Sequence, residues 1–357
     1  MAVYDLERMS VLLVDDSSFT RALLSRVLRS LNVLTITQAS DGAEAINFLK
    51  STVPGALSSP TGVQRYDLII ADWKMTPVDG AMLLKWVRRH KESPNRFMPF
   101  VMLSALSEME TVNEARNLGA NEFLVKPFSI ASISAKLTAL IERPRNFVYT
   151  RDYFGPDRRR NQQPISFENR RVARKENIEI IHSGKIPGTF KEGVSAYYIA
   201  VPNQLKNLVA GLGGSAAEAG QFDESALAAA SMELASMESD YSDWVLDSIS
   251  KLQRAVEELK DQPKNYWKYY TLINNIAHDL RGQGETFGYP LITILGKSLF
   301  DYTRIQTPPD DKFIELIRSH IDSIQAVLRE KIKGQGGEVG MVIVGTLEEA
   351  KRRYEAR

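Results

Sequence analysis

Four short apolar runs within the first 128 residues each have a polar or charged side chain at or near their C-terminal end. They are SVLLVDD (10–16), YDLIIAD (66–72), FVMLSA (100–105) and EFLVKPF (122–128). Runs of this length, rich in Leu, Ile and Val, are typical of strands in a parallel sheet whose two faces are both covered. The polar ends of such strands lie along one edge of an open α/β sheet, where this kind of fold places its site. The side chains expected at that edge are Asp15, Asp16, Asp72, Ser104 and Lys126.

Three carboxylates at one sheet edge need a compensating cation, because neighbouring like charges disfavour ionisation. Oxygen ligands without His or Cys favour a hard ion, and a few carboxylates with room for water suit Mg²⁺. Lys126 adds a point charge suited to a phosphoryl oxygen, and Ser104 adds a small hydroxyl donor. A carboxylate can itself accept a phosphoryl group as an acyl phosphate. That transfer needs mainly positioning and charge neutralisation, which a metal and a lysine supply.

These residues resemble the receiver domain of two-component response regulators over residues 8–142. The matching pieces are Asp15-Asp16, DWKMTPVDG from Asp72, Ser104-Ala105 and Lys126-Pro127-Phe128. The resemblance implies a flavodoxin-like fold, which is a doubly wound, five-stranded parallel sheet flanked by five helices. One departure is the stretch 51–65, which is longer than the family norm and whose Pro, Gly and Ser content predicts a surface loop.

The resemblance also implies a role for each residue of the expected site. Asp72 is the phosphoacceptor, and its donor is a histidine kinase or a phosphotransfer protein. Asp16 and Asp72 bind Mg²⁺ directly, Asp15 acts largely through metal-bound water, and the backbone carbonyl of Lys74 is a further ligand. Many relatives carry Asn where Lys74 stands. The residues assigned to sensing the phosphoryl group and to the switch that follows are Ser104, Lys126 and Phe123.

Composition sets limits on the rest of the chain. Its 357 residues suffice for two domains with linkers. The absence of Cys fits a reducing compartment and excludes disulfides and thiolate metal sites. No run of 18 apolar residues occurs and the N-terminus lacks a signal-peptide pattern, so we expect a cytoplasmic protein without a transmembrane segment. The net charge of +1 gives no global indication of nucleic-acid binding.

Residues 143–203 are predicted to be a basic, partly irregular linker that lets the flanking domains move. The stretch is rich in arginine and contains a Gly-Pro turn at 155–156. It is either a solvated linker or a docking segment for an acidic partner or a membrane surface. No DNA-binding motif accompanies the charge. The run SAYYIAVP (195–202) is either a short strand or a segment packed on a neighbour.

Residues 204–333 are predicted to form a helical domain whose core, about 240–333, is an antiparallel four-helix bundle. Four stretches in this core repeat apolar residues at spacings of three and four, as a core-facing helix stripe requires. The first stripe consists of Val245, Ile249, Leu252, Val256 and Leu259. The tail, residues 334–357, is expected to contain a flexible link, an apolar run that favours a strand, and a charged helical end.

The second predicted helix carries His278 on a face whose neighbours are polar or small. Judged by spacing alone, this histidine is a half-exposed residue without a role. The segment AHDLRGQGETFG (277–288), however, resembles the histidine phosphotransfer domain, with its pattern of His278, Leu280, Arg281 and Gly282. The resemblance implies that His278 carries phosphate and that Arg281 stabilises it. Arg281 replaces the commoner Lys, and Gln283 replaces a commoner small residue.

Taken together, the patterns predict a phosphorelay response regulator with a receiver domain, an arginine-rich linker and a helical phosphotransfer-like domain. It is expected to be a phosphoacceptor rather than an enzyme, with no DNA-binding domain. A downstream receiver protein is a further candidate partner. The alternative is an interaction module, gated by phosphorylation, whose bundle binds a target without transferring phosphate.

Overall fold

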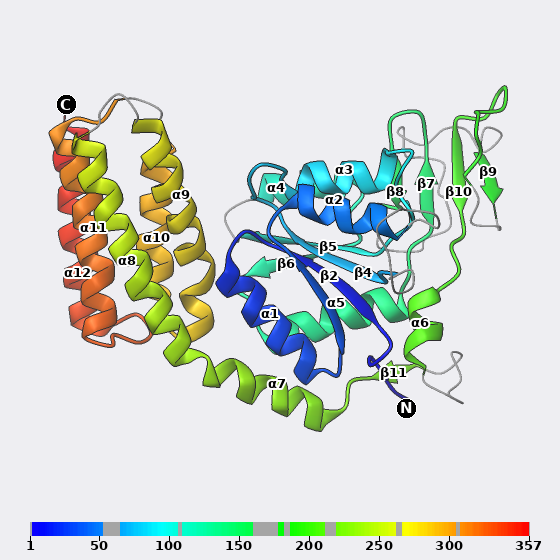
Figure 1. The fold of residues 1–357 in the computed structure, drawn as a ribbon, viewed down its shortest axis with the longest axis horizontal. Coiled ribbons are helices and arrows are strands. Elements are labelled where there is room, and N and C mark those ends of the chain that lie inside the picture. The colour runs from blue at the N-terminus through cyan, green and yellow to red at the C-terminus, as the bar shows by residue number, and fades with distance from the viewer. Residues whose placement is uncertain are drawn as a thin grey trace. The chain divides into compact units, whose positions relative to one another are not determined.

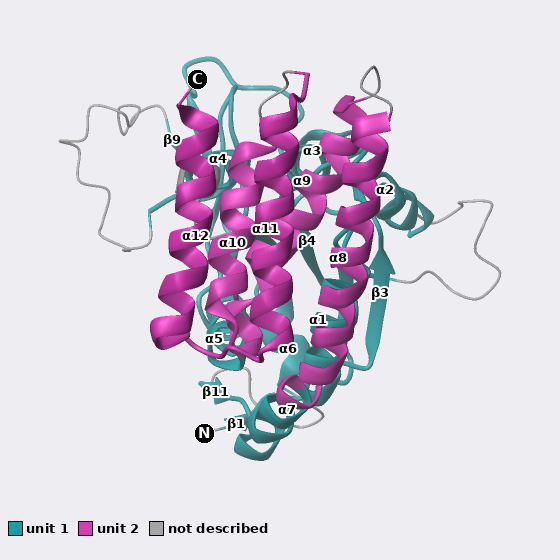
Figure 2. Ribbon diagram, turned by 90° about the vertical axis from the view of Figure 1, so that its left-hand side faces the viewer, with its two compact units in different colours: residues 1–125, 130–233 teal, residues 126–129, 234–357 magenta. Residues whose placement is uncertain are grey.

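The computed structural model describes residues 2–52, 65–105, 109–159, 178–181, 186–210, 219–261, 266–304 and 308–356. Most of the loop expected within 51–65 therefore lies outside the described residues. The chain divides into two compact units, residues 1–125 with 130–233 and residues 126–129 with 234–357 (Figure 2). Residues 204–233, which the sequence assigns to the helical domain, thus belong to the first unit.

The first unit contains a five-stranded main sheet in the order β3-β2-β4-β5-β6 (Figure 1). Its strands are β2 (Ser10–Val14), β3 (Thr35–Ala39), β4 (Leu68–Asp72), β5 (Phe100–Ala105) and β6 (Glu122–Lys126). β2 pairs in parallel with β3 and β4, and β4 pairs in parallel with β5. All residues of β2 and β4 are buried, as expected for strands covered on both faces. The predicted five-stranded parallel sheet is confirmed.

Five helices follow the strands of the main sheet. They are α1 (Ser18–Ser30), α2 (Gly42–Ser51), α3 (Gly80–Arg89), α4 (Met109–Leu118) and α5 (Ile130–Glu142). Side chains of Ser17, Asp41 and Asp79 accept backbone N–H groups in the first turns of α1, α2 and α3. Gly80 begins α3 directly against the end of β4. A Cβ at this position would overlap the carbonyl oxygen of Asp72, so only glycine fits. These contacts fix how the chain turns after β2, β3 and β4.

The described parts of the segment predicted as a partly irregular linker contain a second, small sheet, which the sequence did not predict as a unit. Its strands are β7 (Phe147–Tyr149), β8 (Phe154–Pro156), β9 (Ile178–Ile181) and β10 (Ala196–Ile199). Their order is β8-β7-β10-β9, with β9 parallel to β10 and the other pairs antiparallel. The SAYYIAVP run therefore supplies a strand. Residues 160–177 and 182–185 of the predicted linker lie outside the described residues.

Aromatic side chains attach the small sheet to the loop that precedes β5. The ring centroid of Phe97 lies 5.0 Å from that of Phe147 and 5.4 Å from that of Phe154. Phe147 and Phe154 are buried, with Tyr197 completing their cluster. The beginning of the predicted linker is therefore held against the main sheet, because these rings bury much of their apolar surface there.

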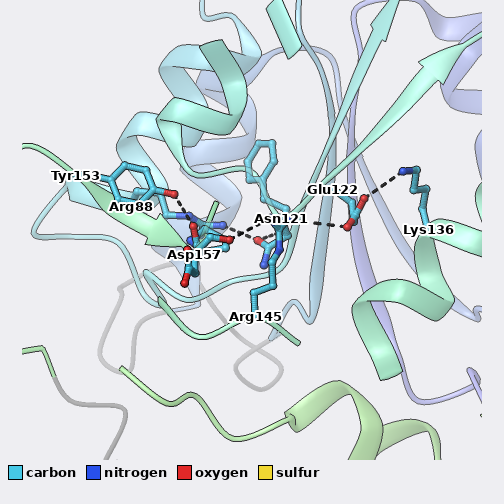
Figure 3. Close-up of polar contacts among 9 residues, drawn as sticks. Arg88, Asn121, Glu122, Lys136, Arg145, Tyr153 and Asp157 are labelled. Atoms are coloured by element: carbon cyan, nitrogen blue, oxygen red, sulfur yellow. Dashed lines mark hydrogen bonds and ion pairs between the residues drawn. The ribbon is translucent and has the colours of Figure 1, made fainter. Parts of the chain in front are cut away.

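Arg88 of α3 is buried beside this attachment, with 1% of its surface exposed (Figure 3). Its guanidinium donates to the carbonyl oxygens of Gly119, Arg96 and Met98 at 2.9 Å, and to Asn121 Oδ1 at 2.8 Å. Burial lowers the pKa of Arg88 to about 9, so the side chain stays protonated at neutral pH. A buried charge is tolerated here because four oxygens replace its hydration.

The chain that follows the small sheet returns to the end of α5. Glu142 accepts hydrogen bonds from Tyr4 Oη at 2.9 Å, Lys206 Nζ at 2.7 Å and the Gly220 amide at 3.1 Å. Strand β1 (Ala2–Val3) pairs in parallel with β11 (Gly220–Gln221). Glu142 thereby ties the N-terminus, α6 (Gln204–Val209) and β11 to the first unit, which explains why residues 204–233 belong to it. The connecting helix α7 (Glu224–Ser236) follows.

Residues 234–357 form the helical unit, which confirms a C-terminal helical region. Its elements are α8 (Glu238–Asp261), α9 (Tyr266–Gln283), the 3₁₀ turn η3 (Glu285–Phe287), α10 (Pro290–Tyr302), α11 (Asp311–Arg329) and α12 (Gly337–Glu355). α8 packs against α9 and α11, and α10 packs against the same two helices. Each residue of the apolar stripe predicted for α8 is buried. Figure 1 shows the long helices side by side.

The tail forms a helix where the sequence predicted a strand. Its apolar run lies within α12, which packs along α11. Gly340, Leu347 and Tyr354 are the buried residues of α12 and recur every seven positions, as a helix seam requires. The ring of Tyr354 lies 5.4 Å from that of Phe313 of α11. Packing on a neighbouring helix thus outweighs the strand propensity of the β-branched residues.

His320 of α11 is fully buried in the helical unit. Its Nδ1 lies 2.8 Å from the Leu316 carbonyl oxygen and its Nε2 lies 2.9 Å from Ser298 Oγ. A carbonyl can only accept, so Nδ1 carries the hydrogen and Nε2 accepts from the serine hydroxyl. Burial lowers the pKa of His320 to about 4. The ring is therefore neutral at physiological pH.

The His320→Gln variant is expected to weaken the acid sensitivity of the helical unit. The unfolded chain binds the extra proton below pH 6.5, whereas the folded chain binds it only below about 4. Stability is thus lost as the pH falls from 6.5 to 4, by about 3 kcal/mol. Melting curves of wild type and variant at pH 5 and pH 7 measure this difference. The partly exposed His90 of the first unit supplies the control, His90→Gln. An equal pH-induced shift in wild type and His320→Gln would contradict the assignment.

Candidate functional site

Two buried carboxylates lie at the ends of adjacent parallel strands. Asp72 is the last residue of β4, and Asp15 directly follows β2. The register pairs Val14 with Ala71, so the two aspartates occupy the next matching positions. The exposed fraction is 0% for Asp15 and 1% for Asp72. The carboxylates are thus held at one sheet edge, as the sequence predicts.

Backbone amides orient one oxygen of each carboxylate. Asp15 Oδ1 accepts from the Ser17 amide at 2.9 Å, and Asp72 Oδ2 accepts from the Lys74 amide at 3.0 Å. Such bonds to the residue two positions later favour the charged form of a carboxylate. The guanidinium of Arg21 donates to the carbonyl oxygen of Asp15. Sequence reasoning missed Arg21, because no pattern indicates that an arginine within α1 reaches back to the end of β2.

The other predicted site residues lie on strands of the same sheet or within two residues after them. Asp16 is exposed and follows Asp15. Ser104 stands in β5 one position after Leu103, the residue that pairs with Asp72, and has an exposed fraction of 2%. Lys126 is the last residue of β6 and has an exposed fraction of 3%. The predicted switch residue, Phe123, is buried in β6. All of these strands end at the same edge, because the sheet is parallel.

The chemistry of this edge fits a magnesium ion. The described residues contain no group of three His, Cys, Asp or Glu side chains placed to share an ion. Mg²⁺ needs fewer protein ligands, because it keeps several waters and is often held by one or two carboxylates. Asp16 and Asp72, with the Lys74 carbonyl, are oxygen donors of the required hard type. A small set of oxygens at one edge therefore suits Mg²⁺ better than a transition metal.

His278 lies on α9 in the helical unit, beside Phe300 of α10. Its ring centroid is 5.7 Å from that of Phe300, and its Nδ1 is 3.7 Å from Asp279 Oδ1. The guanidinium of Arg281 lies over the same Phe300 ring, with its carbon 4.3 Å from the ring centroid. The exposed fraction of His278 is 5%. The expectation of a half-exposed histidine is therefore wrong.

Glycines set the distance between α9 and α10 near His278. A Cβ on Gly296 would lie 2.7 Å from the Arg281 amide nitrogen, so α10 meets the α9 backbone at that point. A Cβ on Gly284 would lie 2.7 Å from the Thr293 amide nitrogen, so the chain also approaches α10 closely at that point. Asn274 adds hydrogen bonds from its side-chain nitrogen to the Phe300 carbonyl and to Thr303 Oγ1. Gly296 has no neighbouring motif, so sequence reasoning missed it.

Comparison with known proteins identifies the first domain. A family model, the response regulator receiver domain, matches residues 11–138. Chemotaxis protein CheY-3 of Vibrio cholerae is 31% identical over 137 residues, which are 38% of this chain and 95% of that protein. Chemotaxis protein CheY of Pseudomonas aeruginosa is 29% identical over 135 residues, 38% of this chain and 98% of that protein. The chain belongs to the response regulator receiver family through its N-terminal domain.

Solved structures resemble the same part of the chain. Vibrio cholerae CheY4 covers 36% of this chain and 95% of its own, with 29% identity and a TM-score of 0.30. The receiver domain of the Pseudomonas aeruginosa sensor histidine kinase PA1611, solved with magnesium in its active-site cleft, covers 36% and 92%, with 25% identity and a TM-score of 0.30. The family model ends at residue 138 and therefore does not bear on the helical unit.

Membership of this family places the chain in two-component signalling. Within the described part of the chain, no helix combines the length and apolar character that crossing a bilayer requires.

Proposed function

We propose that this chain is a phosphorelay response regulator whose Asp72 accepts a phosphoryl group from a phosphohistidine donor. The observation that carries the proposal is the pair of buried carboxylates, Asp15 and Asp72, at adjacent strand ends of a receiver-family sheet. In the transfer, a carboxylate oxygen of Asp72 forms the new P–O bond while the P–N bond of the donor breaks. The released imidazole regains a proton from solvent. The protein's part is positioning and charge neutralisation rather than turnover as an enzyme.

Each residue of the edge has a distinct task in this proposal. Asp16, Asp72 and the Lys74 carbonyl would hold Mg²⁺, which supplies positive charge for the phosphoryl oxygens. Asp15 would help to hold the ion through water, and Arg21 fixes the backbone at Asp15. The sensing residues, Ser104 and Lys126, donate to the phosphoryl oxygens, and Phe123 responds by changing its rotamer.

We further propose that His278 exchanges phosphate with a receiver aspartate, its own or that of another protein. Its support is its position on α9 within the motif that includes Arg281 and Gly282, in a domain whose helices α8–α11 each pack on two of the others. The exposed fraction of 5% means that the ring must become accessible before transfer. The same low exposure favours the second candidate function, a helical domain that binds a partner without transferring phosphate.

The chemical stability of a ³²P label tests this relay. An aspartyl phosphate is lost in alkali, whereas phosphohistidine is lost in acid and survives alkali. The chain, incubated with a phosphorylated receiver or with a labelled kinase, is expected to gain an alkali-stable fraction. That fraction should disappear in His278→Ala and persist in His90→Ala, a change at a partly exposed histidine of the first unit. If no alkali-stable label forms across a panel of receivers, the helical domain acts by binding alone.

A further inference from the structure

A cavity of about 260 Å³ lies at the edge of the main sheet opposite to Asp72. Its walls come from the beginnings of β4, β5 and β6, from the end of α5, and from residues 143–147 and 201–205. Asp67 contributes to the cavity and Asp72 ends the same strand, so β4 separates the two by about 17 Å. The cavity is thus distinct from the phosphoacceptor site.

About half of the wall comes from segments that follow the receiver domain. The family model ends at residue 138, whereas Arg143, Phe147 and Val201 all line the cavity. Residue 147 belongs to the small sheet, and its ring meets that of Phe97, another lining residue, edge to face. The cavity therefore depends on the lining residues between 143 and 147 and between 201 and 205, and not on the receiver domain alone.

The apolar part of the wall suits a flat or branched hydrocarbon body. Phe97, Met98, Leu140, Phe147 and Leu205 line the cavity, together with Val201 and Pro202. Pockets for small ligands combine such a wall with a few polar groups that fix the ligand's orientation. The polar groups that remain available for a ligand decide its chemical class.

Most polar side chains of the wall are already engaged by the protein. Glu122 pairs with Lys136 at 3.1 Å and with Arg145 at 3.9 Å (Figure 3). Asn203 uses both ends of its amide, donating to the Ile141 carbonyl and accepting from the Lys206 amide. These groups have little capacity left to bind a ligand.

Arg143 differs, because its side chain makes no hydrogen bond or ion pair within the described residues and lies exposed at the cavity. Its planar guanidinium can hold a carboxylate or phosphate through two parallel hydrogen bonds. Asp67 is the opposing charge, but it already accepts from the Ser10 amide at 2.9 Å, and burial raises its pKa. Because Glu122 pairs with Lys136 and Arg145, Arg143 is the cationic side chain of the wall that can pair with a ligand.

We propose that this cavity binds a small organic anion with an aromatic or apolar body, whose carboxylate or phosphate group pairs with Arg143. The body lies against Phe97, Phe147 and Val201. Because binding is measured without phosphorylation, failure of this proposal is distinguishable from failure of the proposed relay.

Fluorine NMR of the full chain with four ring-matched probes tests the ligand class. The probes are 4-fluorobenzoate, 4-fluorophenyl phosphate, the neutral 4-fluorobenzamide and the cationic 4-fluorobenzylamine. At least one anion is expected to bind about tenfold or more tightly than the amide, since hydrogen bonds to a charged group are stronger than those between neutral groups. Comparing the two anions distinguishes a carboxylate ligand from a phosphate ligand. The Arg143→Gln variant should remove the preference for the anion, and Arg151→Gln, at an exposed position outside the cavity, should keep it.

A second variant locates the binding site, because Arg143 also borders a shallow groove between α5 and α7. Val201 lines the cavity but not that groove, so Val201→Phe should weaken all probes by filling the cavity. Anion binding that survives Val201→Phe, an unchanged preference in Arg143→Gln, tighter binding of the amine, or no binding of either anion would each overturn the proposal.

Discussion

Replacing Asp72 with Asn is expected to abolish phosphorylation of the receiver domain by acetyl phosphate and its binding of beryllofluoride. An amide oxygen is a poor nucleophile and cannot form the acyl phosphate that a carboxylate forms. The fold should persist, because the variant removes one of three carboxylates from a single sheet edge and lowers their mutual repulsion. Acid-precipitated ³²P label measures the loss, and a melting curve verifies the fold. Chelation of divalent metal should likewise prevent labelling of the wild type.

Asp152→Asn provides the matched control. Asp152 is exposed and lies between β7 and β8, away from the carboxyl ends of the main strands. Its substitution makes the same chemical change without touching the predicted phosphoacceptor. Normal labelling of Asp72→Asn, or loss of label in Asp152→Asn, would show that phosphate is accepted elsewhere.

The main sheet and the order of its site residues could be predicted because local pattern determines both. A strand covered on both faces can be recognised from its short apolar run. The end of that run, at Asp72, can likewise be recognised from neighbouring residues alone. The same reasoning extends to the apolar stripe of α8, whose period follows from the helix itself.

Contacts between distant residues decide the parts that the sequence did not predict. The small sheet depends on Phe97 meeting Phe147 and Phe154, which are about fifty residues away, while its own strands are only three or four residues long. Strands this short carry almost no alternation that a pattern search can detect. The arginine content of 143–203 instead suggested a solvated segment, as it does for most charged stretches.

In the segment of helix α12 the sequence predicted a strand that the structure does not contain. Its β-branched residues favour a strand in isolation, but Leu347 and Tyr354 bury their side chains along α11. In the site, Arg21 escaped prediction for a related reason. Its hydrogen bond to the Asp15 carbonyl depends on how α1 packs on β2, which no local spacing reveals.

Arg88→Met is expected to destabilise the first unit by about 3 kcal/mol or more. Methionine keeps the apolar stem of the side chain but removes every donor. The carbonyls of Gly119, Arg96 and Met98 and the side-chain oxygen of Asn121 would then lose their shared partner. A buried polar group without a partner costs about 1–3 kcal/mol, and relaxation around the site recovers only part of that cost. Urea unfolding followed by the fluorescence of the chain's tryptophans measures the change.

Arg89→Met is the matched control, since Arg89 is the next residue on α3 and its side chain is exposed. That change should cost less than about 1 kcal/mol, as surface substitutions usually do. Arg88→Lys separates charge from geometry, because lysine keeps the charge but lacks the planar fork that reaches oxygens on several segments. We expect Arg88→Lys to be nearly as damaging as Arg88→Met. If lysine restored wild-type stability, the charge alone would stabilise the site, and the four-way hydrogen bonding would not be what anchors α3 beside the small sheet.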